Sequence, residues 1–180
     1  MKILVATEKP FDPAAIEQIR DVVREENHEL MLLENYKSAE EFKSAIANSD
    51  ALIVRSDLVT ADILSAARNL KIVVRAGAGY DNLDLDACTV QGVVAMNTPG
   101  QNANAVAELV FEMMLYLARG GFTGNIGTEL RGKTIGIHAF GNVGRYVAGI
   151  SMGFGMSVYA FDPFVADKVI TAAGAKVCSK

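Results

Sequence analysis

The chain has 180 residues, of which 51% are hydrophobic and 21% are charged, and its formal net charge is -4. This length accommodates one large domain or two small ones, and the composition is typical of a soluble globular protein. The negative charge and scattered basic residues argue against nucleic-acid binding, and no segment approaches the roughly 18 apolar residues of a membrane span.

The first hundred residues alternate between strand and helix patterns. Apolar runs typical of buried strands occur at residues 2–6, 29–33, 51–54, 71–74 and 93–96. Such alternation predicts an α/β fold with a parallel sheet and helices on both of its faces.

The intervening helices have recognisable start signals. Asp12 precedes a proline at a first helical position, and residues 38–41 form a capping-box pattern. Thr60 is expected to open a short helix that ends near Asn69.

Pro99 and Gly100 interrupt this pattern, and we expect a domain junction at residues 97–100. A long helix is predicted from about Asn104 to Arg119. It is apolar on most sides, so we expect it to be buried between two layers. A glycine-rich connection follows it.

A second α/β pattern begins with an apolar strand at residues 133–138 and a glycine loop at residues 139–145. A helix at 146–152, a strand at 157–161 and then Asp162 complete the order of a dinucleotide-binding unit. Ala139 stands where the first glycine of this motif is usual, and we expect its backbone to stay in an ordinary region of φ. A helix near residues 165–173 and a third strand beginning at 175–178 should follow.

Other reactive side chains have simpler interpretations. Cys88 and Cys178 lack the spacing of a metal or redox motif, so reduced thiols packed in a cytoplasmic protein are expected. His138 is interpreted as a packed strand residue, and His28 as a loop residue before a strand. No metal site is predicted.

Several motifs in fixed order carry a family resemblance. Residues 75–84 read RAGAGYDNLD and residues 97–102 read NTPGQN, and these precede AVAE at 105–108, GTELRGKT at 127–134 and the glycine loop. Together they resemble the D-isomer-specific 2-hydroxyacid dehydrogenases. The motifs at residues 75–84 and 97–108 have no role in other proteins with a glycine loop, such as flavodoxin-like proteins and methyltransferases.

The resemblance implies a flavodoxin-like substrate-binding domain at residues 1–98 and the first part of a Rossmann NAD-binding domain at 99–180. It also implies oxidation of a small anionic D-2-hydroxy acid with NAD, with 3-phosphoglycerate as the expected substrate, in serine biosynthesis. Homo-oligomers through the nucleotide-binding domain are expected.

On the substrate side, the resemblance assigns Arg55 to the substrate phosphate, and Arg75, Ala76 and Gly77 to the substrate carboxylate. An arginine fork suits phosphate, and successive small residues can expose backbone N–H groups as an anion-binding nest. A solvated charge at a strand end remains the alternative for Arg55.

On the cofactor side, the resemblance assigns contacts with NAD to Ala78, Gly141, Asn142, Val143 and Gly144. Asp162 would bind the adenosine ribose and repel the 2′-phosphate of NADP. The alternative for Asp162 is a turn acid before Pro163.

The resemblance places the catalytic arginine, glutamate and histidine beyond the end of this chain, so no catalytic residue is assigned within it. We therefore expect the 180-residue chain alone to be inactive. The alternative is a truncated, non-catalytic NAD(H)-binding module.

Overall fold

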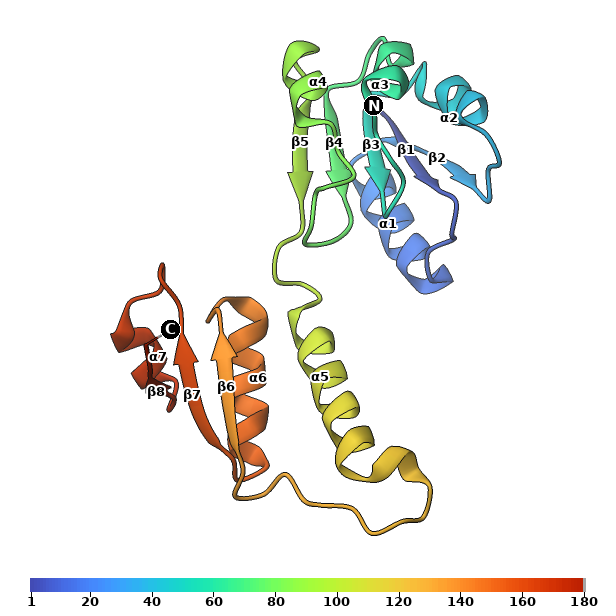
Figure 1. The fold of residues 1–180 in the computed structure, drawn as a ribbon. Coiled ribbons are helices and arrows are strands. Elements are labelled where there is room, and N and C mark those ends of the chain that lie inside the picture. The colour runs from blue at the N-terminus through green and yellow to red at the C-terminus, as the bar shows by residue number, and fades with distance from the viewer. Residues whose placement is uncertain (180) are drawn as a thin grey trace. The chain divides into compact units, whose positions relative to one another are not determined.

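The computed structural model describes residues 1–179 of the chain. Two compact units follow one another along the sequence, Met1–Pro99 and then the remainder from Gly100 onward. Figure 1 labels the helices and strands of each unit.

The first unit is built on a five-stranded parallel sheet. Its strand order is β2-β1-β3-β4-β5, which is the order of flavodoxin-like folds, so the α/β prediction is confirmed. The bounds of the strands are β1 Lys2–Thr7, β2 Glu29–Glu34, β3 Ala51–Val54, β4 Ile72–Arg75 and β5 Val94–Asn97. All five strands are parallel, so their carboxyl ends meet at one edge of the sheet.

Four helices connect these strands: α1 Pro13–Glu25, α2 Ala39–Ile46, α3 Ala61–Ala66 and α4 Leu85–Val90. Each begins after a side chain that accepts a backbone N–H bond, and these caps are Asp12, Ser38, Thr60 and Asp84. Helix α3 ends at Ala66, earlier than the sequence predicts, because the chain leaves helical geometry at Ala67 (φ -88°, ψ 80°).

The main core of this unit lies between one face of the sheet and helices α2, α3 and α4. Leu4, Leu52, Val54 and Val73 point into it from the strands, and Phe42 enters from α2. Figure 1 shows α1 lying apart from this group of helices.

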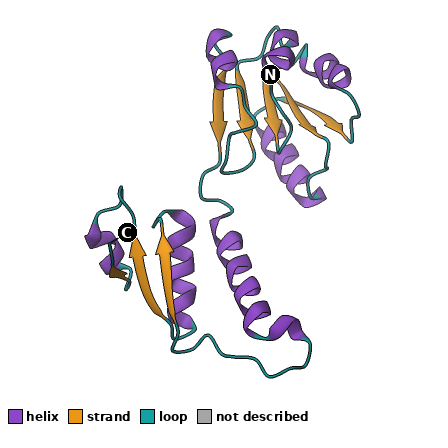
Figure 2. Cartoon of the chain, in the orientation of Figure 1, coloured by secondary structure: helices purple, strands orange, loops and turns teal. Residues whose placement is uncertain are grey.

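The second unit contains a three-stranded parallel sheet of order β6-β7-β8, as the first half of a Rossmann fold requires. Figure 2 distinguishes its strands from its helices and loops. The elements in chain order are α5 Ala103–Ala118, the 3-10 turn η1 Gly120–Phe122, β6 Thr134–His138, α6 Asn142–Gly153, β7 Ser157–Phe161, α7 Asp167–Ala172 and β8 Lys176–Val177.

Helix α5 is less buried than its sequence predicts. Ala107 and Phe111 are buried, and Phe111 stacks on Phe154 with ring centroids 5.2 Å apart. The opposite side is exposed, with half of Leu109 and Met113 and 75% of Leu117 accessible. The prediction of burial between two layers was wrong, because among residues 1–179 α6 is the one long helix that packs along α5. At 16 residues α5 is the longest described helix, and none within residues 1–179 combines the length and apolarity of a membrane span.

The sheet of the second unit is covered unevenly. Ile135, Ile137 and Val158 face the core beneath α6. On the other face, Thr134, Gly136 and His138 are exposed. The prediction of a packed His138 was wrong, because no described helix covers that face; the His138 ring lies 5.4 Å from that of Phe161.

Candidate functional site

In the first unit, the residues assigned to the substrate lie at the carboxyl edge of the sheet. Arg55 directly follows β3, and Arg75 ends β4 opposite Val54 in the strand register. The Arg75 Nε donates a 2.9 Å hydrogen bond to the carbonyl oxygen of Arg55. Neither arginine forms an ion pair with a described residue, so both charges remain available to an anion.

The loop after β4 is held in place by its neighbours. The Ala76 N–H donates to Val54 at 2.8 Å, the Gly77 N–H donates to Arg75 at 2.9 Å, and the Asn97 amide donates to the carbonyl of Ala78 at 2.7 Å. Gly77 lies so close to the Arg75 guanidinium that a Cβ there would collide with it.

This arrangement leaves only part of the expected nest open. The N–H groups of Ala76 and Gly77 are already used, whereas those of Ala78 and Gly79 donate to no acceptor among residues 1–179. An anion at this loop would therefore meet two free amides and the Arg75 guanidinium.

In the second unit, the glycine loop leads directly into α6. Gly141 is the N-cap of the helix, and no side chain caps it, in contrast to the four helices of the first unit. The first-turn amides of Asn142, Val143 and Gly144 therefore have no helical acceptor. An N-terminus of this kind attracts a phosphate group.

Gly144 lets α6 approach β6 closely. A Cβ at this position would collide with the carbonyl oxygen of Ala139 and lie 3.2 Å from Cγ2 of Ile137. Gly141 is different, since a Cβ there would meet no atom within 4 Å. The space beside Gly141 is therefore open.

Ala139 has a φ of +90°, so the prediction of an ordinary backbone angle was wrong. The contacts around it impose this geometry. Its N–H donates to Phe161 at 2.8 Å, and the next N–H, that of Phe140, donates to the Asp162 carboxylate at 2.6 Å. Together these bonds fix the chain direction at both sides of Ala139.

Asp162 supports the loop as well as lying beside it. One carboxylate oxygen accepts the Phe140 N–H, and the other accepts those of Phe164 and Val165 at 2.8 and 3.1 Å. These bonds, that of Phe164 first and that of Phe140 next, lower the pKa of the Asp162 carboxyl. An ionised carboxylate offers about four acceptor positions, so about one remains for a ribose hydroxyl.

The sequence analysis assigned no role to two polar residues near these loops. The Arg145 Nε donates to the carbonyl of Phe140 at 3.2 Å, which brings a cation to the glycine loop. Asp57 accepts hydrogen bonds from the Glu8 N–H and the Tyr36 hydroxyl at 2.7 and 2.8 Å. The only signal for Asp57 in the sequence is an acid placed soon after a buried strand.

The remaining reactive groups are dispersed. His28 precedes β2, at the opposite edge of the sheet from Arg55. Cys88 is buried, which raises the pKa of its thiol, and Cys178 is half-buried; both are free thiols. Residues 1–179 hold no cluster of three or more metal-ligating side chains.

Comparison with known proteins gives a consistent result. A family model described as D-isomer specific 2-hydroxyacid dehydrogenase, catalytic domain, matches residues 3–172. D-3-phosphoglycerate dehydrogenase of Rattus norvegicus is 41% identical over 151 residues, which cover 76% of this chain and 28% of the relative. Hydroxypyruvate reductase of Thermotoga maritima is 40% identical over 149 residues, which cover 75% of this chain and 49% of the relative.

A solved structure agrees with these sequence matches. The NAD+-bound 3-phosphoglycerate dehydrogenase of Entamoeba histolytica has a TM-score of 0.87 and 46% identity, and the match covers 92% of this chain and 55% of that one. The chain thus spans about half, or less, of the length of these relatives.

Proposed function

This chain belongs to the D-isomer specific 2-hydroxyacid dehydrogenase family, and we propose that it carries the substrate-side loops and first nucleotide-binding elements of an NAD-dependent enzyme. The reaction oxidises the CH–OH group of a D-2-hydroxy acid, and 3-phosphoglycerate is the proposed substrate, at the entry to serine biosynthesis. The observation that carries the proposal is the uncapped N-terminus of α6, bounded by Gly141, Gly144 and Asp162.

The residues present fit NAD. Gly141 leaves room for the pyrophosphate, the amides of Asn142 and Val143 would hold its oxygens, and the remaining acceptor position of Asp162 would take a ribose hydroxyl. NAD+, when bound, accepts the hydride released from the substrate carbon. Ala78 belongs to the first unit, and its contact with the cofactor is part of the same proposal.

The first unit would bind the acid itself. Arg55 and Arg75 supply two unpaired cations, and the free amides of Ala78 and Gly79 supply neutral donors. Arg55 is proposed to hold the phosphate, because a guanidinium fork binds phosphate through two parallel hydrogen bonds. Arg75, Ala76 and Gly77 would shape the carboxylate site.

The cofactor proposal is tested by titrating the purified chain with NADH and NADPH and following fluorescence. NADH should bind at least tenfold more tightly, because the Asp162 carboxylate repels a 2′-phosphate, and Asp162→Asn should reduce this preference. Equal affinity for the two nucleotides, or binding of neither, would refute the assignment.

The substrate proposal is tested by calorimetry with 3-phosphoglycerate and, for comparison, D-glycerate. Arg55→Gln should weaken the binding of 3-phosphoglycerate about tenfold while leaving both D-glycerate and NADH unaffected. If Arg55→Gln weakens the binding of both acids equally, Arg55 does not contact the phosphate.

A turnover assay distinguishes an active dehydrogenase from a non-catalytic NAD(H)-binding module. Oxidation needs a base for the hydroxyl proton, and neither histidine of the chain is placed for it: His28 lies at the wrong edge of its sheet, and His138 projects from an open sheet face. We therefore expect saturable NADH binding without turnover of 3-phosphoglycerate and NAD+ by this chain. Measurable turnover would contradict this expectation.

A further inference from the structure

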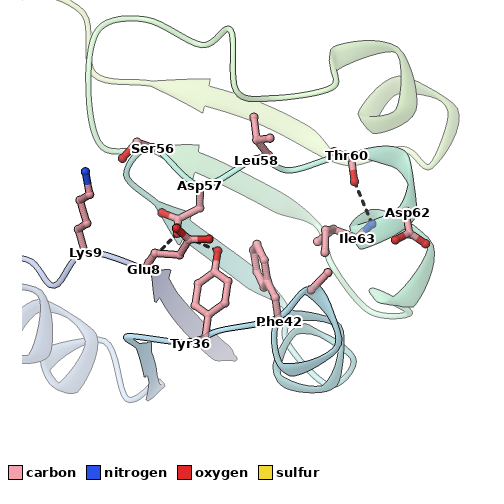
Figure 3. A pocket seen from close by; sticks show the side chains of 11 residues that line it. Glu8, Lys9, Tyr36, Phe42, Ser56, Asp57, Leu58, Thr60, Asp62 and Ile63 are labelled. Atoms are coloured by element: carbon pink, nitrogen blue, oxygen red, sulfur yellow. Dashed lines mark hydrogen bonds between the residues drawn. The ribbon is translucent and has the colours of Figure 1, made fainter.

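A pocket in the first unit lies next to Arg55, because Ser56 and Asp57, which directly follow Arg55 in the chain, form part of its wall. It has a volume of about 540 Å³ and opens between the ends of β1 and β3 and the helices α2 and α3. Figure 3 shows the side chains around it. Neither Arg55 nor Arg75 lines this pocket.

Asp57 is the unusual residue of the pocket. It is only 7% exposed, and one carboxylate oxygen accepts the two hydrogen bonds from Glu8 and Tyr36. Its second oxygen, Oδ2, is buried and has no hydrogen-bond partner among the described residues. Buried acceptors are almost always paired, because an unpaired one loses its hydration without compensation.

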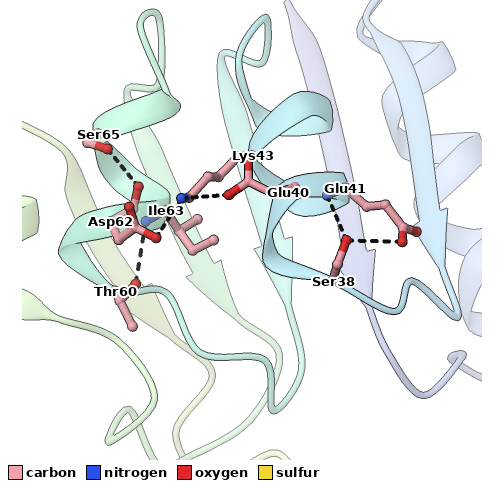
Figure 4. Close-up of polar contacts among 8 residues, drawn as sticks. All are labelled: Ser38, Glu40, Glu41, Lys43, Thr60, Asp62, Ile63 and Ser65. Atoms are coloured by element: carbon pink, nitrogen blue, oxygen red, sulfur yellow. Dashed lines mark hydrogen bonds and ion pairs between the residues drawn. The ribbon is translucent and has the colours of Figure 1, made fainter.

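No cation of the chain compensates Asp57. Among residues 1–179 it forms no ion pair, and Figure 3 shows the Lys9 side chain extending away from its carboxylate. Asp62, also on the pocket wall, is neutralised by Lys43 at 2.7 Å, and Figure 4 shows that Lys43 is shared with Glu40. Lys43 is therefore already engaged elsewhere.

A second carboxylate adds to the negative charge beside Asp57. The pKa of Tyr36 is raised by burial first, then by the hydrogen bond and charge of Asp57, and also by the charge of Glu8. Asp57 and Glu8 thus both act on the same hydroxyl group. Glu8 is exposed, so its side chain can move to admit a ligand.

Apolar side chains form another part of the wall, alongside the polar Lys9, Ser56 and Thr60. Phe42 and Ile63 are buried and form the base, and Leu58 is 65% exposed at the rim. A ligand that matches the pocket would therefore carry a positive charge at one end and an apolar body at the other.

We propose that this pocket binds a small organic cation, in which an ammonium group is held between Asp57 and Glu8. The ammonium reaches the buried Asp57 Oδ2 when the exposed Glu8 side chain shifts, and the apolar body packs on Phe42, Leu58 and Ile63. This site adjoins Arg55 but uses none of the side chains that are proposed to bind the 2-hydroxy acid or NAD.

The test is a titration of the purified chain with phenethylammonium chloride, followed by two-dimensional NMR of backbone amides. Saturable shifts are expected in residues 56–63 and near Tyr36. 3-Phenylpropionate has a similar shape and the opposite charge, and it should produce no saturable shift.

Variants then assign the contacts. Asp57→Asn should weaken phenethylammonium binding at least tenfold, and Glu8→Gln and Leu58→Ser, both at exposed positions, should weaken it several-fold. Glu25→Gln removes the same charge from an exposed position on α1 and should leave binding unchanged.

Three results would overturn the proposal: no saturable binding of phenethylammonium, equal binding of 3-phenylpropionate, or unaltered binding by the pocket variants. If Asp57→Asn fails to fold, as judged by circular dichroism, Glu8→Gln and Leu58→Ser decide the outcome alone. Changes in NADH affinity have no bearing on this result.

Discussion

Ala139 holds a φ of +90° at the turn between β6 and α6, a region that a side chain disfavours. For an L-residue this costs about 1–2 kcal/mol, whereas glycine enters the region freely. A glycine at this position would relieve that strain. It would also raise the entropy of the unfolded chain, which offsets about 0.5–1 kcal/mol of the relieved strain. The two effects oppose each other, and the strain is the larger.

We therefore expect Ala139→Gly to raise the free energy of unfolding by about 0.5–1 kcal/mol, as measured by urea denaturation. Ala15→Gly, in the first turn of α1, is the matched control and should lower it, because glycine has the lower helix propensity. Equal destabilisation by the two substitutions would mean that Ala139 is not strained.

Asp162 makes the stability of the second unit depend on pH. Its folded-state pKa is lowered, chiefly by the N–H groups of Phe164 and Phe140. A lowered pKa means that the ionised form favours folding above the unfolded value of about 4, and that this contribution is lost as the pH falls below it.

Asp162→Asn cannot titrate, so this variant should lose less stability than the wild type between about pH 7 and about pH 3. Urea midpoints at the two pH values provide the measurement. Glu25→Gln, which removes an exposed acid from the other unit, should behave like the wild type. A parallel loss in wild type and Asp162→Asn would argue against the role of these hydrogen bonds.

At the scale of elements, two of the three glycines of α6 have opposite requirements. Gly144 faces β6 and has no room for a Cβ, whereas a Cβ at Gly149 would meet no atom within 4 Å. Gly144→Ala should therefore destabilise the chain by about 2 kcal/mol or more, since backbone must move.

Gly149→Ala serves as the control within the same helix. It should stabilise by about 0.5–1 kcal/mol, because alanine has the higher helix propensity. Thermal unfolding by circular dichroism distinguishes the two variants. A Gly144→Ala protein as stable as the wild type would show that α6 does not depend on this close approach.

The elements themselves were largely predictable because their signals are local. The strand at 157–161 was predicted with its observed bounds, and Asp12, Ser38 and Thr60 cap the helices they were expected to open. In the observed capping box, the Glu41 N–H donates to the Ser38 hydroxyl oxygen at 3.3 Å, and the Ser38 hydroxyl donates to the Glu41 carboxylate at 3.1 Å (Figure 4).

Apart from the early end of α3, the errors concern contacts between residues far apart in the sequence. The angle at Ala139 depends on Phe161 and Asp162, and the exposure of His138 depends on whether a helix covers its sheet face. Asp57 was missed because its partners, Glu8 and Tyr36, are separated from it by 49 and 21 positions. The binding roles of Arg55, Arg75 and the glycine loop remain predictions that the titrations above would test.

At the scale of the whole molecule, the exposed apolar side of α5 has a consequence for assembly. Leu109, Met113 and Leu117 lie on one 16-residue helix, and contiguous apolar patches of this kind mark protein interfaces. We propose that two copies of the chain associate through this side of the nucleotide-binding unit.

Sedimentation equilibrium should then report a dimer for the wild type and a monomer for the double variant Leu109→Glu and Met113→Glu. Val22→Glu is the control, because Val22 is 60% exposed on α1 in the other unit, and it should leave the dimer intact. A wild-type monomer at all concentrations would reject the proposed interface.

The loop around Ala139 also bears on how such nucleotide loops are found in genomes. Its shape is imposed by two hydrogen bonds, from the Ala139 N–H to the Phe161 carbonyl and from the Phe140 N–H to the Asp162 carboxylate. The absence of a side chain at Gly144 also contributes. The first glycine of the motif can therefore be replaced by alanine at a modest energetic cost, whereas replacement of Gly144 requires the backbone to move. A search that requires all three glycines would overlook chains of this kind. A pattern that pairs the position of Gly144 with an acid at the end of the next strand would retain them.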